Sequence, residues 1–236
     1  MLIDLHTHTR PGSADSFLDP DELIERSKAA GLDGIVLSEH DNTWDLDAVR
    51  ELSRRHQFLV LPGLEVTTDH GHILVYGARA FDPFMRDSAQ LANHVQHLGG
   101  AMVAPHPYRG HSPYDWADAE QVDRAVERAL ANPAYQRVHA VEVLNGHGSL
   151  DENHFSELVA RSLGRASTGG TDSHQRSDIG KTATYFERDI RDEQDLIHEI
   201  LAGRCWAVDL TGGRLTEQSE RHRVPDSLAS VLSPRR

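Results

Sequence analysis

The chain has 236 residues, among them 24 Lys and Arg, 37 Asp and Glu and one cysteine, and its formal net charge is −13. This acidic balance argues against broad electrostatic binding of nucleic acid, which relies on basic patches. The length fits a single domain, because α/β barrels commonly reach this size.

The sequence shows no sign of export or of a membrane span. It begins with an apolar run rather than a basic-then-apolar leader, and it has no apolar stretch of about 20 residues. Cys205 alone cannot form an internal disulfide, which agrees with a reducing compartment. We therefore expect a cytoplasmic protein that has no membrane partner.

The first predicted elements are a strand over residues 1–5 and a helix from Pro20 to Ala30. Asp19 is placed to accept hydrogen bonds from the first free N–H groups of this helix, and Pro20 stands where no N–H is needed. Glu22 follows at a favoured position, and Gly31 is typical of a helix end.

Strands and helices alternate along the rest of the chain. Apolar residues at helical spacing predict helices over residues 45–56, 87–98, 116–131, 151–163 and 192–202. Short apolar runs predict strands over residues 34–37, 58–61, 73–76, 101–105, 138–143, 166–171 and 182–186. The alternation favours an α/β fold with a parallel sheet. We expect a catalytic barrel over residues 1–210, a loop over 105–115 at the mouth of the site, and a polar, poorly ordered tail over 211–236.

Histidines and carboxylates gather where the apolar runs end. In His6-Thr7-His8 the side chains alternate along a strand, so both imidazoles face the same side and can reach one ion. Similar residues adjoin later runs, namely Glu39-His40-Asp41, Glu65, His72, His106 and Asp172-Ser173-His174. A mixed set of imidazoles and carboxylates suits Zn, Mn or Fe and suits Ca poorly. The pattern predicts a polynuclear metal site at the mouth of a barrel.

In this order the motifs resemble those of the PHP (polymerase and histidinol phosphatase) family of metal-dependent phosphoesterases. The resemblance covers about residues 1–210 and rests on His6-Thr7-His8, Asp15, Ser38-Glu39-His40-Asp41, Gly63-Leu64-Glu65-Val66, Gly71-His72-Ile73-Leu74, His106-Pro107 and Asp172-Ser173-His174. It implies a distorted (β/α)7 barrel with two to three divalent ions, Mn, Zn or Fe, at its C-terminal mouth.

Carried over by position, the resemblance assigns nine ligands. The first ion would be held by His6, His8, Glu65 and Asp172; the second by Glu65, His72 and His106; the third by Asp15, His40 and His174. Glu65, Asp172 and His174 are also expected to act in catalysis. The ions would jointly activate a water, and the resulting hydroxide would attack the phosphorus in line.

Three residues are candidates for substrate binding. Arg109 lies in the predicted loop, and a guanidinium matches a phosphate edge with paired hydrogen bonds. Lys181 is a weaker candidate for the same work, and His147 follows a predicted strand and is expected to face the mouth. Glu142 and Asn145 are further candidates for contact with the substrate. For Glu142 the alternative is that its side chain points outward from the strand.

Several ligand assignments have rivals. Asp19 or Asp21 competes with Asp15, for which a turn or cap role is the alternative. His70 competes with His72, which directly adjoins the apolar run. Asp41 either accepts a hydrogen bond from the ring N–H of His40 that does not face the metal, or it is part of a turn.

The leading function is hydrolysis of a phosphate ester in a small metabolite or a nucleotide, with phosphate as a product. The alternatives are an exonuclease acting on short oligonucleotides, an amidohydrolase and a non-catalytic metal-binding module. An amidohydrolase would normally have a lysine bridge where this chain offers Glu65, and the full ligand set argues against a non-catalytic module. The acidic charge predicts no stable complex with nucleic acid.

Overall fold

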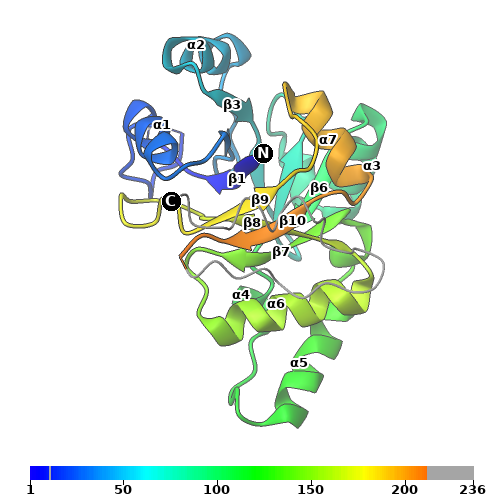
Figure 1. Ribbon diagram of the computed structural model, residues 1–236. Helices are drawn as coiled ribbons and strands as arrows, with labels where there is room; N and C mark the ends of the chain where they lie inside the picture. Colours follow the sequence, from blue (N-terminus) through cyan, green and yellow to red (C-terminus); the bar gives the residue numbers. More distant parts are fainter. Residues whose placement is uncertain (11, 212–236) are drawn as a thin grey trace.

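A computed structural model describes residues 1–10 and 12–211 of the chain (Figure 1). Within this part lie seven α-helices, ten strands and two short 3-10 helices. The helices are α1 (Pro20–Ala29), α2 (Leu46–His56), η1 (Pro83–Arg86), α3 (Ser88–Leu98), α4 (Tyr108–His111), α5 (Ala119–Leu130), η2 (Tyr135–Arg137), α6 (Leu150–Leu163) and α7 (Glu193–Leu201). None of these helices is long and apolar enough to cross a membrane.

Side-chain caps explain where the longer helices begin. An aspartate accepts hydrogen bonds from the first turn of α1, α2, α3, α5 and α7, and a Ser149–Glu152 capping box starts α6. These caps satisfy N–H groups that have no partner inside the helix. The helix predicted from Pro20 is thereby confirmed. The loop predicted over 105–115 contains the short helix α4, and α5 begins at Ala119 rather than at 116 because Asp118 caps it there.

The strands form two sheets of five. They are β1 (Leu2–Thr7), β2 (Gly34–Leu37), β3 (Leu59–Pro62), β4 (Leu64–Thr68), β5 (Gly71–Tyr76), β6 (Ala101–Ala104), β7 (Ala140–Asn145), β8 (Ala166–Gly170), β9 (Thr182–Tyr185) and β10 (Trp206–Asp209). One sheet has the order β10-β9-β1-β2-β3 and the other the order β4-β5-β6-β7-β8. Within them β1, β2 and β3 are parallel, and so are β6, β7 and β8, whereas β4, β5, β9 and β10 introduce antiparallel pairs.

The expected barrel of seven parallel strands is therefore not found as a closed, hydrogen-bonded ring in the described part of the chain. β3 and β4 are separated only by Gly63, so the chain passes from one sheet directly into the other. At the opposite edges, β8 and β9 are joined by side chains: the Thr184 hydroxyl donates to Gly169 O (2.8 Å) and that of Thr182 to Gly170 O (2.7 Å). These hydroxyl groups stand where a closed barrel would have backbone hydrogen bonds.

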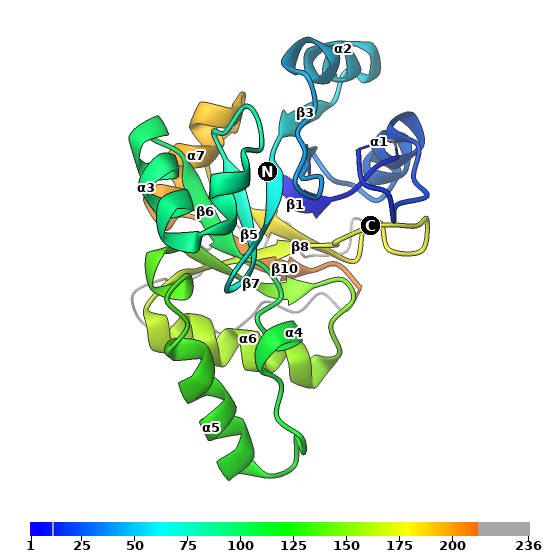
Figure 2. The ribbon, with the colours of Figure 1, turned by 180° about the vertical axis from the view of Figure 1, so that it is seen from behind.

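The two sheets share one core, and helices cover their outer faces. Ile3 and Val36 of one sheet and Leu74 and Val103 of the other belong to a single buried cluster, against which α7 also packs. Helices α1 and α2 cover the side of β2 and β3. Seen from behind, α3 and α7 lie together on one side, and α5 and α6 lie beyond β7 (Figure 2). Packing on both faces explains why the strands read as continuous apolar runs.

The C-terminal ends of the parallel strands meet at one end of the molecule. Isolated bridges join Thr7 to Ser173 and His40 to Glu65, both in parallel orientation. The end of β1 thus lies beside the segment that follows β8, and the segment that follows β2 lies beside β4. The predicted boundary near residue 210 follows β10, and the tail predicted over 211–236 lies, apart from Thr211, outside the described residues.

Candidate metal centre

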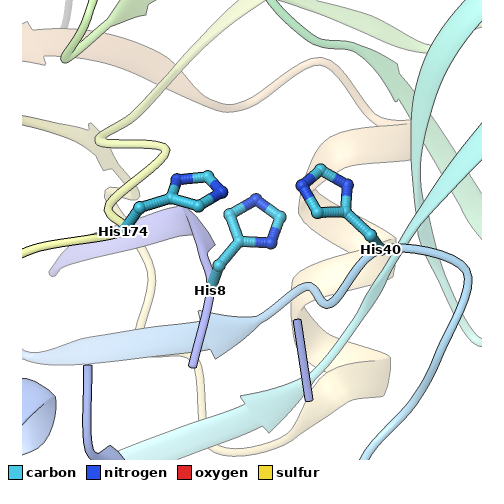
Figure 3. A group of neighbouring side chains, drawn as sticks. All are labelled: His8, His40 and His174. Carbon is cyan, nitrogen blue, oxygen red and sulfur yellow. The ribbon is translucent and has the colours of Figure 1, made fainter. Parts of the chain in front are cut away.

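The site begins where β1, β2 and β8 end. Backbone hydrogen bonds join the ends of β1 and β8, since His8 N donates to Ser173 O (3.1 Å) and Asp172 N donates to His6 O (2.7 Å). Ser38 N, directly after β2, donates to Thr7 O (2.9 Å). Three imidazoles from three chain segments come together here, those of His8, His40 and His174 (Figure 3). The His8 ring lies stacked against the other two, with ring centroids 4.3 Å from His40 and 4.4 Å from His174.

Four buried side chains converge on one point, namely those of His6, His8, Glu65 and Asp172. The Nε2 atom of His6 lies 3.4 Å from both Glu65 Oε2 and Asp172 Oδ1. The Nε2 atom of His8 lies 3.3 Å from the same two oxygens. A tetrahedral ion with metal–ligand distances near 2.0–2.1 Å has edges of about 3.3–3.5 Å between its ligands. The spacing fits such an ion.

The hydrogen bonding of these four atoms also fits a metal ion. Each of them is buried and makes no well-aligned hydrogen bond within the described residues, although His40 Nδ1 approaches Glu65 Oε2 to 2.9 Å from the side. Buried polar atoms without partners are rare, because each costs roughly 1–3 kcal/mol. Four potential ligand atoms that face one another in this way are consistent with a shared cation. The donors are therefore suited to a divalent metal ion.

A second group surrounds the other oxygen of Glu65. Its Oε1 atom lies 2.9 Å from His72 Nδ1 and 3.0 Å from His106 Nε2. Its Oε2 atom also lies 2.9 Å from Nδ1 of His40, and His40, Glu65 and His72 form a compact set of possible ligands. The structure thus brings together Glu65, His72 and His106 as expected, with one carboxylate between two groups of imidazoles.

A third group lies at the rim. The Oδ2 atom of Asp15 is 3.4 Å from Nε2 of His40 and 3.4 Å from Nε2 of His174. The Asp15 side chain is 60% exposed, whereas His40 and His174 are mostly buried. Asp19, one of its rivals, caps α1, and the other, Asp21, pairs with Arg55 and His56. Of these three aspartates, only Asp15 lies against His40 and His174.

The charge states suit metal binding. Burial raises the pKa of Glu65, but His6, His106 and His40 outweigh it and hold that pKa well below the usual range. Burial also raises the pKa of Asp172, and His6 likewise outweighs it, so that this pKa is lowered. Burial lowers the pKa of His8 to about 4, which leaves its ring neutral at pH 7. Metal ligands must be deprotonated, and these groups already are.

His6 differs from His8. Burial lowers the pKa of His6, but the carboxylates of Asp172, Glu142 and Glu65 outweigh it, and the net pKa lies well above the ordinary value. The ring is thus protonated when these carboxylates have no other cation. A metal ion entering this group must displace a proton from His6.

Three residues at the site have a backbone conformation that L-residues rarely adopt. The φ angles are 47° at Asp41, 32° at His106 and 54° at Asp172. Such positive φ values cost of order 1–3 kcal/mol each and persist where surrounding contacts impose them. Here Asp41 N donates to Glu65 O, and His106 N donates to the carboxylate of Glu142. Strain of this kind is concentrated at functional sites.

The contacts of His70 and Asp41 bear on two alternatives, namely His70 as the rival of His72 and Asp41 as a support of His40. The ring of His70 lies 2.8 Å from Asp69 Oδ1 and 2.9 Å from the Ser88 hydroxyl, and it joins none of the groups above. Asp41 accepts from Thr67 N (2.9 Å) and pairs with Arg86 (2.7 Å). The Asp41 side chain therefore contacts the second half of β4 and Arg86 rather than the ring of His40.

The three substrate-binding candidates lie at different places. Arg109 pairs with Oδ2 of Asp172, the oxygen that does not face His6 and His8. The Nε2 atom of His147 lies 3.0 Å from Asp172 O, at the edge of the site. Lys181 lines a separate cavity of about 610 Å³ beside α6, where it bonds to Gly146 O (3.2 Å) and lies 3.5 Å from Asp178.

Sequence reasoning named Glu142 and Glu39 but did not predict the contacts that they make beside the site. Glu142 is buried and lies 2.9 Å from Nδ1 of His6, so it neither points outward nor lies in the mouth. Glu39 is fully buried and accepts from the Ser13 hydroxyl and the Trp44 ring N–H. The available signal was an acidic residue inside an apolar strand, Ala140-Val141-Glu142-Val143.

Known families match two parts of the chain. A family described as the PHP domain matches residues 4–106, and one described as PHP-associated matches residues 151–205. A 5'-3' exoribonuclease, Rnm, of Salmonella typhimurium is 29% identical over 125 residues, which cover 50% of this chain and 42% of the exoribonuclease. An uncharacterized protein of Methanocaldococcus jannaschii is 23% identical over 117 residues, which cover 46% of this chain and 68% of that protein. The match thus spans less than half of the exoribonuclease.

Solved structures share the fold. A proposed metal-dependent phosphoesterase from Bifidobacterium adolescentis has a TM-score of 0.54 at 18% identity, covering 89% of this chain and 98% of its own. An amidohydrolase from Chromobacterium violaceum has a TM-score of 0.54 at 20% identity over 88% of this chain and 98% of its own. PsfC from Pseudomonas syringae has a TM-score of 0.57 at 19% identity over 86% of this chain and 93% of its own. By these matches the chain carries a PHP domain over residues 4–106 and a PHP-associated segment over residues 151–205.

Proposed function

We propose that the protein is a metal-dependent phosphoesterase that hydrolyses a small phosphorylated metabolite or a nucleotide and releases phosphate. The observation that carries this proposal is the convergence of four buried, unpartnered donor atoms from His6, His8, Glu65 and Asp172. Two further groups of histidines adjoin the same carboxylate of Glu65 or the His8 ring. A site with several cations suits a substrate that carries several negative oxygens.

The ligand assignment is part of the proposal. His6, His8, Glu65 and Asp172 would hold the first ion; Glu65, His72 and His106 the second; Asp15, His40 and His174 the third. We propose two to three ions of Mn, Zn or Fe, because imidazole and carboxylate donors suit these metals. When bound, they would lower the pKa of a water towards neutrality and draw charge from the phosphoryl oxygens.

The protein's own groups would orient the substrate. The guanidinium of Arg109 reaches Asp172, and the Arg109 side chain is 41% exposed, so we propose that its remaining donors are open to a phosphate oxygen. In this role Arg109 would bind one edge of the phosphate while Asp172 keeps its guanidinium in place. The ring of His147 lies against Asp172 O and Asp178 and would border the leaving group. Lys181 would contact the substrate only if part of the substrate entered the cavity beside α6.

The remaining features of the proposal concern context. We propose that the two sheets together act as a distorted, open relative of a (β/α)7 barrel, with residues 1–210 as the catalytic domain and 211–236 as a tail. We propose a cytoplasmic location. We also propose that the protein forms no stable complex with nucleic acid, because its net charge is −13. An exonuclease acting on short oligonucleotides is the second candidate, favoured by the likeness to the exoribonuclease.

A substrate screen tests this function. The purified protein, loaded with Mn, Zn or Fe, is incubated with phosphomonoesters, cyclic and acyclic diesters and short oligonucleotides, and phosphate or nucleotide release is measured. We expect metal-dependent turnover of at least one small phosphate ester. Turnover of oligonucleotides alone would support the exonuclease. No turnover of any of these substrates with any of the three metals would contradict both.

A further inference from the structure

Glu142 is a buried carboxylate outside the proposed ligand set, and three donors surround it. Its Oε1 atom lies 2.9 Å from Nδ1 of His6. Its Oε2 atom accepts from the backbone N–H of His106 (3.0 Å) and from Nδ2 of Asn145 (2.9 Å). One carboxylate of β7 thus contacts one histidine of the first group and the backbone of a histidine in the second.

The chemistry of Glu142 fixes the tautomer of His6. An ionised carboxylate only accepts hydrogen bonds, so the nitrogen that faces it must carry a proton. His6 Nδ1 is therefore protonated, and once the ring is neutral its lone pair lies on Nε2. That Nε2 atom is the buried, unpartnered atom that faces Glu65 and Asp172. Glu142 thus presents His6 in the one neutral form that can bind a metal from this side.

A parallel arrangement supports His8, with Ser13 in between. The Ser13 hydroxyl donates its single proton to Glu39 Oε2 (2.6 Å). Its oxygen then accepts from His40 N (3.2 Å) and lies 3.2 Å from Nδ1 of His8. Because the hydroxyl proton is already committed to Glu39, His8 Nδ1 must be the donor in this contact. The lone pair of His8 therefore also lies on Nε2.

Two glycines leave room for the side chains of Glu142 and Glu39 to pack against the backbone. A Cβ atom at Gly170 would lie 2.5 Å from Cβ of His6 and 2.6 Å from Oε1 of Glu142. A Cβ atom at Gly12 would lie 2.3 Å from the carboxyl carbon of Glu39. Real Cβ atoms do not make contacts this short, so both positions require glycine. The backbone is thus built around the two carboxylates.

We propose that Glu142, directly, and Glu39, through Ser13, are positioning residues that hold His6 and His8 with Nδ1 protonated and Nε2 turned towards the first group. This inference rests on the proposed function, because it assigns a purpose to residues around the same centre. It goes beyond that function by naming the groups that prepare the site before any ion arrives. Neither carboxylate is proposed to touch metal or substrate.

The test uses Glu142→Gln and the milder Ser13→Ala. His6 and His106 face different oxygens of Glu142, and a glutamine replaces one of these oxygens with an NH2 group, so one of the two donors loses its acceptor. The affinity of each variant for Zn²⁺ is measured by competition with a chelator, at constant pH. We expect the affinity of the first site to fall about 10–100-fold in either variant, as for other residues that orient metal-bound histidines.

Glu199→Gln is the matched control. Glu199 is also a buried glutamate, but it lies on α7 and pairs with Arg204, away from the histidines. We expect its Zn²⁺ affinity to equal that of the wild type even though its stability falls. Loss of affinity in this control to the same extent would show a general effect of unfolding and would overturn the positioning role.

Histidine NMR of the Zn²⁺-loaded wild type provides a second readout. With ¹⁵N-labelled histidine, long-range proton–nitrogen correlations distinguish a ring that carries its proton on Nδ1 from one that carries it on Nε2. We expect His6 and His8 to be protonated on Nδ1, and protonation of either on Nε2 would overturn the proposal. Wild-type affinity in Glu142→Gln and Ser13→Ala would overturn it while leaving the phosphoesterase intact. Failure of the wild type to bind Zn²⁺, Mn²⁺ or Fe²⁺ would instead overturn the proposed function itself.

Discussion

The Nε2 atom of His106 lies 3.0 Å from Oε1 of Glu65, whereas the other oxygen of Glu65 faces a different set of histidines. That second oxygen, Oε2, lies 3.4 Å from His6, 3.3 Å from His8 and 2.9 Å from His40. One fully buried carboxylate thus stands between two groups of imidazoles. A single negative group shared in this way lowers the repulsion between two cations held close together.

Replacing Glu65 with glutamine should therefore remove metal and activity together. The amide has the same shape but no charge, so we expect bound metal to fall by at least half and kcat to fall by about a thousandfold. Elemental analysis and phosphate release measure the two effects, and circular dichroism checks the fold. Glu51→Gln, on the exposed part of α2, is the control and should match the wild type. Wild-type turnover by Glu65→Gln would sink the bridging role.

Asp15→Ala should remove the ion proposed for Asp15, His40 and His174 and leave the other two ions bound. Asp15 contacts only His40 and His174 among the nine proposed ligands, and its side chain is 60% exposed. We expect about one ion fewer per chain, because the fully buried donors of the first group are untouched. Asp19→Ala is a matched control, since removal of this helix cap costs about 1 kcal/mol of stability but should leave the metal content unchanged. Equal metal contents in Asp15→Ala and wild type would contradict a third ion.

Arg109→Ala should weaken substrate binding more than chemistry. Hydrogen bonds from a guanidinium to a charged group are worth about 1.5–3 kcal/mol, so we expect KM to rise about 10–100-fold with kcat changed much less. Arg109→Lys keeps the charge but loses the paired geometry, and its KM should lie between those of wild type and alanine variant. Steady-state kinetics with the substrate found in the screen decide the matter. Unchanged kinetics in both variants would exclude a role for Arg109 in phosphate binding.

Acid stability should depend on Glu199. Its two oxygens accept hydrogen bonds from Arg204 at 2.7 and 2.6 Å, and this pairing lowers its pKa although burial raises it. A lowered carboxyl pKa stabilises the fold above the ordinary glutamate pKa of about 4.3, and that contribution is lost as the pH falls through the folded-state pKa.

Glu199→Gln should accordingly lower the free energy of unfolding by about 1 kcal/mol at pH 7 and by much less near pH 3. Urea unfolding of wild type and variant at both pH values, with a chelator present throughout, measures the difference. A penalty that persists unchanged near pH 3 would show that the ionised pair is not its source.

Local patterns in the sequence predicted much of the site. The two-residue alternation of His6 and His8 placed both imidazoles on one side of β1, and both reach Glu65 and Asp172. The cap at Asp19 placed the start of α1 correctly. Such features depend on residues that are neighbours along the chain, so the sequence displays them directly.

Features that depend on distant contacts were not predicted. Neither β4 nor β10 was predicted. Only Gly63 separates β3 from β4, so no connecting segment marks the start of β4 in the sequence. The side-chain links from Thr182 and Thr184 to β8, in place of a closed ladder, have no signature in sequence. The role of Glu142 depends on the approach of β7 to β1, which are separated by 136 residues at the contact with His6.

The most direct test of the central claim is phosphate ester hydrolysis by the wild-type protein before and after removal of its metal. Protein is purified, its bound metal is quantified, and turnover of the best phosphate ester is measured untreated, after chelation and dialysis, and after return of Mn²⁺, Zn²⁺ or Fe²⁺. We predict turnover that disappears on chelation and returns with two to three ions per chain. Full turnover by protein freed of metal would contradict this account of the site.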